Sequence, residues 1–155
     1  MIERRSVELL TAKQAHLDDV ASIESGSFPC PWKRDYFLQE LFLPMRFNRV
    51  ILCRDGGPLQ GHVIAYQFSH YVVPELHISK IATHRSARRQ GLANALMEDL
   101  FKFCRDRGIN TITLEVRVSN TPARTFYTRL GFKDDYIRKR YYPDGEDALV
   151  MGLRW

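Results

Sequence analysis

The clearest chemical signal in the sequence is a basic, glycine-containing loop between an expected strand and the longest expected helix. Its residues are Arg88, Arg89, Gln90, Gly91, Leu92 and Ala93. A glycine followed two positions later by a small residue lets an anion approach the backbone, where the free N–H groups of the first helical turn face it. The loop lacks the Lys-Ser/Thr pair of a P-loop and the glycine spacing of a Rossmann fingerprint. These features favour a pyrophosphate-binding site, although a basic loop capped by a helix fits the same residues equally well.

Two further side chains could move protons. Glu115 lies on the polar side of a regular strand expected at 111–118, and Tyr127 lies on a short helix among apolar residues at helical spacing. A carboxylate can take a proton from an α-ammonium group, whose pKa is about 8, and a phenol can donate one. Periodicity alone favours a solvated glutamate and a core tyrosine, so at this point both interpretations stay open.

Metal and thiol chemistry find little support in the sequence. His77 is expected on a strand with no second His or Cys near it, so we interpret it as a structural histidine. Cys30, Cys53 and Cys104 are odd in number and far apart, which excludes a disulfide scaffold and indicates a reducing compartment. None of them adjoins a candidate base in a motif, so no covalent intermediate on a cysteine is expected.

Length and composition bound the class of protein. A chain of 155 residues with 45% hydrophobic content fits a single domain over residues 1–155. No apolar run follows Met1–Arg5, and no stretch approaches the roughly 20 apolar residues of a membrane span, so a cytoplasmic protein without a membrane partner is expected. The net charge of +5 fits a polyphosphate ligand, a ribosomal or nucleic-acid partner, or no particular partner.

The elements that must position these residues follow from hydrophobic periodicity and turn signals. Strands are expected at 7–10, 50–53, 61–68, 76–83, 111–118, 132–142 and 148–153, and a long helix at 91–105. Thr11 and Thr121 are expected to cap the first and last of the other three helices, and Pro44 to stop the second. Strand 76–83 does not alternate strictly, as is typical of a central or bulged strand. The order β-α-α-β-β-β-α-β-α-β-β predicts an α/β (α+β) domain, a mixed sheet with helices on both faces.

Longer stretches of the chain resemble the GNAT superfamily of N-acetyltransferases. Arg88-x-x-Gly91-x-Ala93 is similar to the acetyl-CoA signature of that family, Q/R-x-x-G-x-G/A, with alanine where glycine is commoner. Segments that resemble its RimI-type branch follow in order at 75–78, 81–83, 114–117, 119–120, 126–127, 130–132 and 137–148, besides Phe28 and Pro31-Trp32. The segment 137–148 is the most specific, because other GNAT members lack it.

The resemblance implies a GNAT fold, a mixed and mostly antiparallel sheet with splayed central strands, and acetyl-CoA as cosubstrate without a metal. It implies that backbone groups of Ile81 and Thr83, on either side of Ala82, pair with the pantetheine arm. Backbone N–H groups across 88–93 would hold the pyrophosphate, and Asn120 would contact the cofactor near its reactive end.

The resemblance also implies roles in the reaction. Glu115 would take the proton of the acceptor amine, directly or through one water, and Tyr127 would protonate the departing CoA thiolate in a ternary complex. Trp32, Tyr141 and Tyr142 would surround a peptide slot, although ordinary packing is the alternative for these three aromatic residues.

Together these features predict an acetyl-CoA-dependent N-alpha-acetyltransferase that acetylates the N-terminal amine, an alanine, of a ribosomal protein. One alternative is a GNAT enzyme acting on another protein N-terminus, a lysine or a small-molecule amine. Another is a CoA-binding or partner-binding module without turnover, which the presence of Glu115 and Tyr127 disfavours. No direct nucleic-acid binding is expected.

Overall fold

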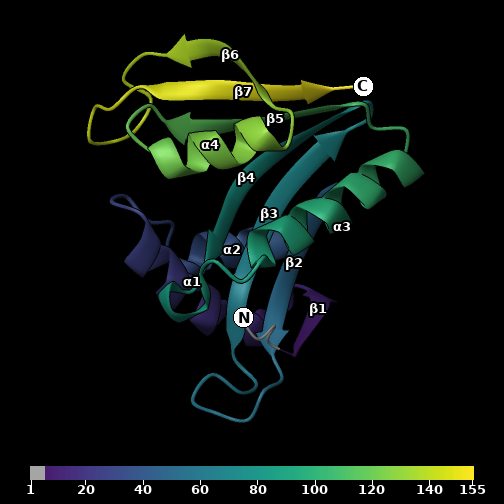
Figure 1. The fold of residues 1–155 in the computed structure, drawn as a ribbon, viewed down its shortest axis with the longest axis vertical. Coiled ribbons are helices and arrows are strands. Elements are labelled where there is room, and N and C mark those ends of the chain that lie inside the picture. Colours follow the sequence, from purple (N-terminus) through teal and green to yellow (C-terminus); the bar gives the residue numbers. More distant parts are fainter. Residues whose placement is uncertain (1–5) are drawn as a thin grey trace.

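Seven strands form one sheet in the computed structural model, in the order β1-β2-β3-β4-β5-β7-β6 (Figure 1). The strands are β1 Val7–Thr11, β2 Arg46–Cys53, β3 Val63–Val72, β4 Glu75–Thr83, β5 Thr111–Arg117, β6 Lys133–Arg138 and β7 Ala148–Arg154. The helices are α1 Leu17–Ser27, α2 Arg34–Phe42, α3 Leu92–Asp106 and α4 Thr121–Arg129, with short 3-10 turns at Gln14–His16 and Arg85–Ala87. The structure describes residues 6–155, so the segment Met1–Arg5 lies outside the described residues.

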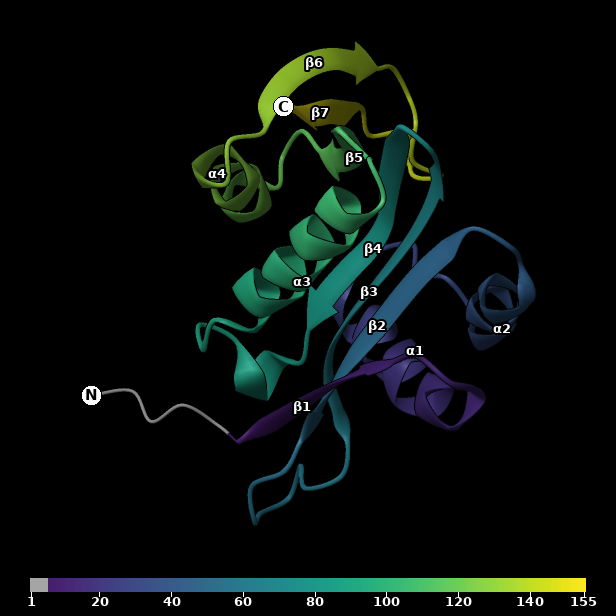
Figure 2. The ribbon, with the colours of Figure 1, turned by 90° about the vertical axis from the view of Figure 1, so that its right-hand side faces the viewer.

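Helices cover both faces of this sheet. Figure 2 shows α1 and α2 on one side of it and α3 and α4 on the other. Neighbouring strands run antiparallel except β4 and β5, which are parallel. The expected element order and the mixed, mostly antiparallel sheet are therefore confirmed. Within the described residues no helix is both long and apolar enough to cross a membrane.

The two central strands part halfway along their length. β4 and β5 pair only from Glu75↔Thr111 to Ile78↔Leu114, and beyond these pairs each strand continues without the other. The His84 N–H donates to the Ile64 carbonyl oxygen of β3 at 2.8 Å. Because backbone groups alternate in direction along a strand, those of Thr83 and Ile81 face the opposite side, toward the gap. The expected splayed strands are confirmed, and they leave part of the β4 edge without a strand partner.

A β-bulge interrupts β4 at Ser79. The register passes from Phe68↔Lys80 to Ser69↔Ile78, so Ser79 is an extra residue without an opposite partner on β3. The irregular pattern expected for this strand is thus confirmed. One result is that Lys80 points to α1, where its Nζ lies 2.9 Å from Glu24 Oε2.

Helix α3 is fixed to the sheet by one apolar stripe. Its side chains Leu92, Leu96, Met97, Leu100 and Cys104 are all buried. Full burial of such side chains stabilises a fold by about 1.5–3 kcal/mol each, so this stripe also fixes the loop that precedes the helix.

Two expected helix caps and the expected end of one strand were wrong. Thr11 does not cap a helix; it ends β1, and its Oγ1 accepts a hydrogen bond from Arg49 Nη1 at 3.1 Å. Helix α4 is capped by Asn120, whose Oδ1 accepts from the Ala123 N–H at 3.3 Å, and not by Thr121. β6 ends at Arg138 and not near 142, because Arg140 has a φ of 51° and its N–H donates to Asp147, which turns the chain.

Candidate active site

Two pockets open where β4 and β5 part. The first, of about 390 Å³, lies between the end of β4, the following loop, α3 and α4. The second, of about 470 Å³, lies between β4, β5, the segment after α1 and the loop between β6 and β7. Both are lined by Phe28, Ile81, Ala123 and Tyr127. Two ligands, one in each pocket, can therefore meet across these shared residues.

The first pocket has the features of an anion site. The earliest bond within α3 runs from the Ala95 N–H to the Gly91 carbonyl oxygen at 3.0 Å, so the preceding N–H groups have no partner within the helix. Gly91 has a φ of 79°, and no atom lies within 4 Å of the position of a Cβ there. Arg88 and Arg89 line the same pocket and add positive charge. A polyphosphate fits this combination of free N–H groups, helix dipole and guanidinium groups.

The edge of β4 continues the first pocket. Ile81, Ala82 and Thr83 line it, and Arg88 Nε donates to the Thr83 carbonyl oxygen at 3.3 Å. An extended ligand could pair with the other backbone groups on this edge. Strand edge and anion site together fit the pantetheine and pyrophosphate parts of acetyl-CoA. Within the loop 88–93, all of which the structure describes, Gln90 does not line the pocket.

Glu115 lies in the second pocket, paired with two basic side chains. Its Oε2 is 2.7 Å from His77 Nε2, its Oε1 is 3.4 Å from Arg138 Nε, and its side chain is 10% exposed. His77 Nδ1 in turn lies 2.9 Å from Thr113 Oγ1, so both ring nitrogens have partners. A carboxylate held in this way can accept a proton from a cation that enters the pocket.

His77 was interpreted from the sequence as a structural residue, and its pairing with Glu115 was missed. The pairing depends on the register of β4 and β5, in which His77 stands opposite Thr113, two residues before Glu115. The motif match around 75–78 placed His77 on the correct strand. Periodicity carries no information about register between distant strands, so the contact could not be predicted.

Tyr127 stands between the two pockets. Its ring is buried, and it lines both of them. Burial, with a smaller contribution from Tyr142, raises the pKa of the Tyr127 phenol well above its ordinary value. The phenol therefore keeps its proton at neutral pH and can donate it, or a hydrogen bond, to a group in either pocket.

Aromatic residues wall the second pocket on two sides. Trp32 lies with its ring centroid 4.3 Å from that of Tyr36, on the α1–α2 side. Tyr141 and Tyr142, whose ring centroids are 5.1 Å apart, belong to the loop between β6 and β7. Burial raises the pKa of Tyr142 to about 12. The expected slot residues are thus brought together, whereas Asn120 lines this pocket and not the first one.

A buried carboxylate anchors the Trp32 wall. Glu24 is fully buried and accepts hydrogen bonds from the Tyr66 hydroxyl at 2.6 Å and the Trp32 N–H at 2.9 Å. Its third partner is Lys80, whose Nζ also lies 4.3 Å from the ring centroid of Phe28. This pair was not predicted from the sequence, because a glutamate and a lysine at polar positions of a helix and a strand are usually solvated residues.

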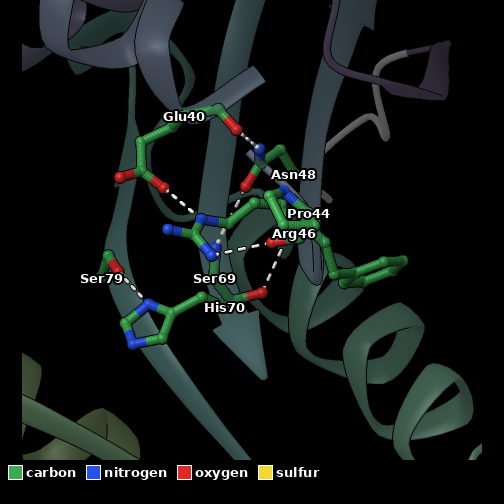
Figure 3. A network of polar contacts seen from close by, with 8 residues as sticks. Glu40, Pro44, Arg46, Asn48, Ser69, His70 and Ser79 are labelled. Atoms are coloured by element: carbon green, nitrogen blue, oxygen red, sulfur yellow. Dashed lines mark hydrogen bonds and ion pairs between the residues drawn. The ribbon is translucent and has the colours of Figure 1, made fainter. Parts of the chain in front are cut away.

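A second polar network lies beside the pocket, around His70 and Ser79 (Figure 3). His70 Nδ1 is 3.2 Å from Ser79 Oγ, and the His70 ring centroid is 5.3 Å from that of His77. Arg46 Nε pairs with Glu40 Oε2 at 2.5 Å in the same network. Burial, followed by the charges of His77 and Arg46, lowers the pKa of His70. His70 is therefore neutral at physiological pH, and Ser79, which lines the second pocket, is held in place by it.

The chemistry that the site can perform is proton transfer between two neighbouring ligands. A carboxylate on β5 and a protonated phenol on α4 line pockets that meet at shared residues. Within residues 6–155 no group of three or more His, Cys, Asp or Glu side chains is arranged to hold a metal ion. The first pocket fits an anionic ligand, and the second combines aromatic walls with a carboxylate that can receive a cationic amine.

Comparisons with known proteins agree with this arrangement. The model of the Acetyltransferase (GNAT) family matches residues 17–132. The [Ribosomal protein bS18]-alanine N-acetyltransferase of Escherichia coli (strain K12) is 42% identical over 137 residues, 84% of this chain and 86% of that one. The crystal structure of the ribosomal-protein-S18-alanine N-acetyltransferase from Escherichia coli has a TM-score of 0.83 at 31% identity and covers 96% of this chain and 94% of that one. Arabidopsis thaliana NAA60 in complex with acetyl-CoA shares the fold, with a TM-score of 0.84 at 15% identity over 97% of this chain and 100% of that one.

Proposed function

The chain belongs to the GNAT family of acetyltransferases, and we propose that it acetylates the N-terminal alanine of ribosomal protein bS18 with acetyl-CoA as donor. The observation that carries the proposal is the pair of pockets that meet at Tyr127, one fitted to an anionic ligand and one containing Glu115. The substrate is that of the relative that is 42% identical over most of both chains. Acetyl-CoA brings an activated thioester, so the protein has only to bind, orient and move protons.

The first pocket would hold the cosubstrate through backbone groups. Ile81 and Thr83 would offer the β4 edge that β5 does not pair with, where the Thr83 carbonyl oxygen already accepts from Arg88, and the loop 88–93 with the first turn of α3 would bind the pyrophosphate. This part of the β4 edge can accept a ligand because β5 does not pair with β4 beyond Ile78. The buried apolar stripe of α3 keeps the loop 88–93 in place. Asn120, which lines the second pocket, would contact the cosubstrate near its reactive end from there.

Glu115 would accept the proton of the incoming α-ammonium group. An α-amine loses its proton about 2.5 pKa units more easily than a lysine side chain, so one carboxylate suffices for an N-terminus. His77 and Arg138 would hold the Glu115 carboxylate in one orientation. Tyr127, which keeps its proton at neutral pH, would donate to the sulfur that leaves.

The walls of the second pocket favour an extended peptide as acceptor. Trp32 on one side and Tyr141 and Tyr142 on the other leave a slot that a main chain with a small first residue would fit. We further propose that residues 1–155 act as one acetyltransferase domain in the cytoplasm. The three free cysteines, two of them buried, support a reducing compartment.

Two peptides of one sequence that starts with alanine test the proposal. The first has a free N-terminus and its internal Lys replaced by Arg, and the second has a blocked N-terminus and the Lys retained. Release of free CoA thiol should be fast with the first peptide and slow with the second. Equal or faster acetylation of the blocked peptide would assign the protein to lysine-directed enzymes. CoA binding without thiol release from any peptide would indicate a binding module.

A further inference from the structure

The loop between β6 and β7, residues 139–147, forms one wall of the second pocket although it has no regular structure of its own. Tyr141, Tyr142 and Pro143 of this loop line the pocket. A loop can define the width of a slot only if it is fixed to the sheet. The side chain that fixes it is Arg117 on β5, two residues after Glu115 and therefore on the same side of the strand.

Arg117 contacts Tyr142, Asp144 and Glu146 of this loop. Its Nη1 lies 2.8 and 3.0 Å from the two carboxylate oxygens of Asp144 and 3.0 Å from Glu146 Oε1. Its Cζ lies 4.1 Å from the ring centroid of Tyr142, in a cation–π contact. Glu146 is held further by the Ser119 N–H, which donates to its Oε2 at 2.9 Å. One guanidinium group thus binds two carboxylates and supports a wall residue of the slot.

The same guanidinium group lies near the segment that follows α1. Cys30, in the segment between α1 and α2, contributes to the raised pKa of Arg117 as the last of its causes, and Cys30 and Arg117 both line the second pocket. Burial opposes the charge of Arg117, but the hydrogen bonds with Glu146 and Asp144 outweigh it and raise the pKa of Arg117. The side chain is only 11% exposed. Arg117 is therefore a permanent charge on β5 that holds the loop 139–147 and lies beside Cys30.

We propose that Arg117 is a positioning residue for the acceptor peptide, which sets the spacing between the Cys30 segment and the Tyr141–Tyr142 wall. The inference rests on the proposed function, because it assigns the second pocket to the acceptor. Lysine replaces it poorly, since an ammonium group lacks the planar guanidinium that stacks on the Tyr142 ring while its Nη1 binds both carboxylates. The effect belongs to peptide binding, because the proton-accepting group has other partners: Glu115 pairs with His77 and Arg138, whereas Arg117 pairs with Asp144 and Glu146.

The first test is steady-state kinetics of Arg117→Lys with the alanine peptide. The KM for the peptide should rise about tenfold, as expected when charge-assisted hydrogen bonds with this geometry are lost. The kcat at saturating peptide and the Kd for CoA should stay within about twofold, because neither depends on the wall spacing. Arg154→Lys is the matched control, since Arg154 pairs with Asp135 at 2.8 and 3.1 Å on the same sheet, outside both pockets.

An unchanged peptide KM in Arg117→Lys would overturn the proposal. So would an equal loss of CoA affinity, which would indicate general damage to the fold. Reversing the charges in Arg117→Asp/Asp144→Arg should recover part of the peptide affinity lost in Arg117→Asp alone. No recovery would contradict a role through the loop.

The second test needs no turnover, so it stays informative if the proposed acceptor is wrong. Cys30 is half-buried in the slot, whereas Cys53 and Cys104 are buried elsewhere. Iodoacetamide should label Cys30 faster in Arg117→Lys than in the wild type, because the charge beside the thiol is kept while the walls loosen. Cys53 and Cys104 should stay unlabelled in both proteins, which reports an intact fold. Equal labelling rates at Cys30 would refute the positioning role, and absence of peptide turnover in the wild type would refute the proposed function alone.

Discussion

Replacing Gly91 by valine would test the anion site with a matched control in the same protein. Gly91 begins α3 with a φ of 79°, and no atom lies within 4 Å of an added Cβ. Gly61, in the turn between β2 and β3, has the same φ of 79° and the same open surroundings. Any effect of backbone strain should therefore be equal in Gly91→Val and Gly61→Val, and Gly91 lines the first pocket whereas Gly61 lines neither of the two pockets described above.

The expected magnitudes follow from this comparison. A side chain in the left-handed region costs roughly 1–2 kcal/mol, so both variants should lose that stability and melt about 2–8 °C lower. At Gly91 the new side chain also enters space that an anion needs for close approach to the backbone. Loss of one charge-assisted hydrogen bond, about 1.5–3 kcal/mol, should weaken CoA binding about 10- to 150-fold.

Titration calorimetry with CoA and thermal melting would measure both effects. The stability loss should be similar in the two variants, and only Gly91→Val should lose CoA affinity. A folded Gly91→Val protein with wild-type CoA affinity would refute the assignment of the pyrophosphate to this loop. Equal losses of affinity in both variants would show that the effect comes from strain and not from the site.

Three other predictions concern proton transfer, pH and the buried ion pair. The variants Glu115→Gln and Tyr127→Phe should bind CoA normally. With the alanine peptide, both should turn over at least about 10²-fold more slowly than the wild type. A wild-type rate for Glu115→Gln from about pH 6 to about pH 9 would contradict the role of Glu115 as the base. Because the pKa of His70 is lowered in the fold, the unfolded chain binds the proton more readily, so stability should fall as the pH drops below about 6.5 until the folded-state pKa is passed. Melting temperatures of His70→Gln across that range should show a smaller slope than the wild type, and an identical slope would argue against this origin. Lys80→Met should lose about 3 kcal/mol of stability in urea unfolding, because its buried carboxylate partner remains without a cation; a loss under about 1 kcal/mol would show that the other donors satisfy that carboxylate.

The local pattern of apolar and polar residues predicted the strands and helices in which that pattern extends over the whole element. β5 was expected at 111–118 and runs from Thr111 to Arg117, because apolar and polar residues alternate without exception. Helix α3 was expected at 91–105 and runs from Leu92 to Asp106, because its apolar stripe and flanking glycines mark both ends. The ends of β1 and β2 were misjudged, since distant strand pairing extends them beyond their apolar residues: Thr11 pairs with Arg49, and Arg46 with His70.

The features of the site also divide into those that a local motif predicts and those that depend on contacts between distant segments. Residues carried by motifs, such as Tyr127 and the loop 88–93, fall at the pockets because each motif includes the turn that orients it. Contacts between motifs were not predictable, because pairs such as Glu115 with His77 depend on the register between β4 and β5. Arg117 and its partners Asp144 and Glu146 lie in two segments that resemble the family, 114–117 and 137–148, but their contact depends on the path of a loop that no periodicity describes.

The parting of β4 and β5 also affects how the molecule opens. Within residues 6–155, the strand pairs between the β1–β4 half of the sheet and the half that contains β5, β7 and β6 extend only from Glu75↔Thr111 to Ile78↔Leu114. Amide groups along this seam should exchange with deuterium through openings that cost less free energy than global unfolding, and the two halves should behave as separate cooperative units. A molecule bound to both halves at once would couple them, and a ligand at 100 times its Kd adds about 2.7 kcal/mol. Exchange protection at the seam should therefore rise with ligand concentration more steeply than protection at the outer strands β1 and β6.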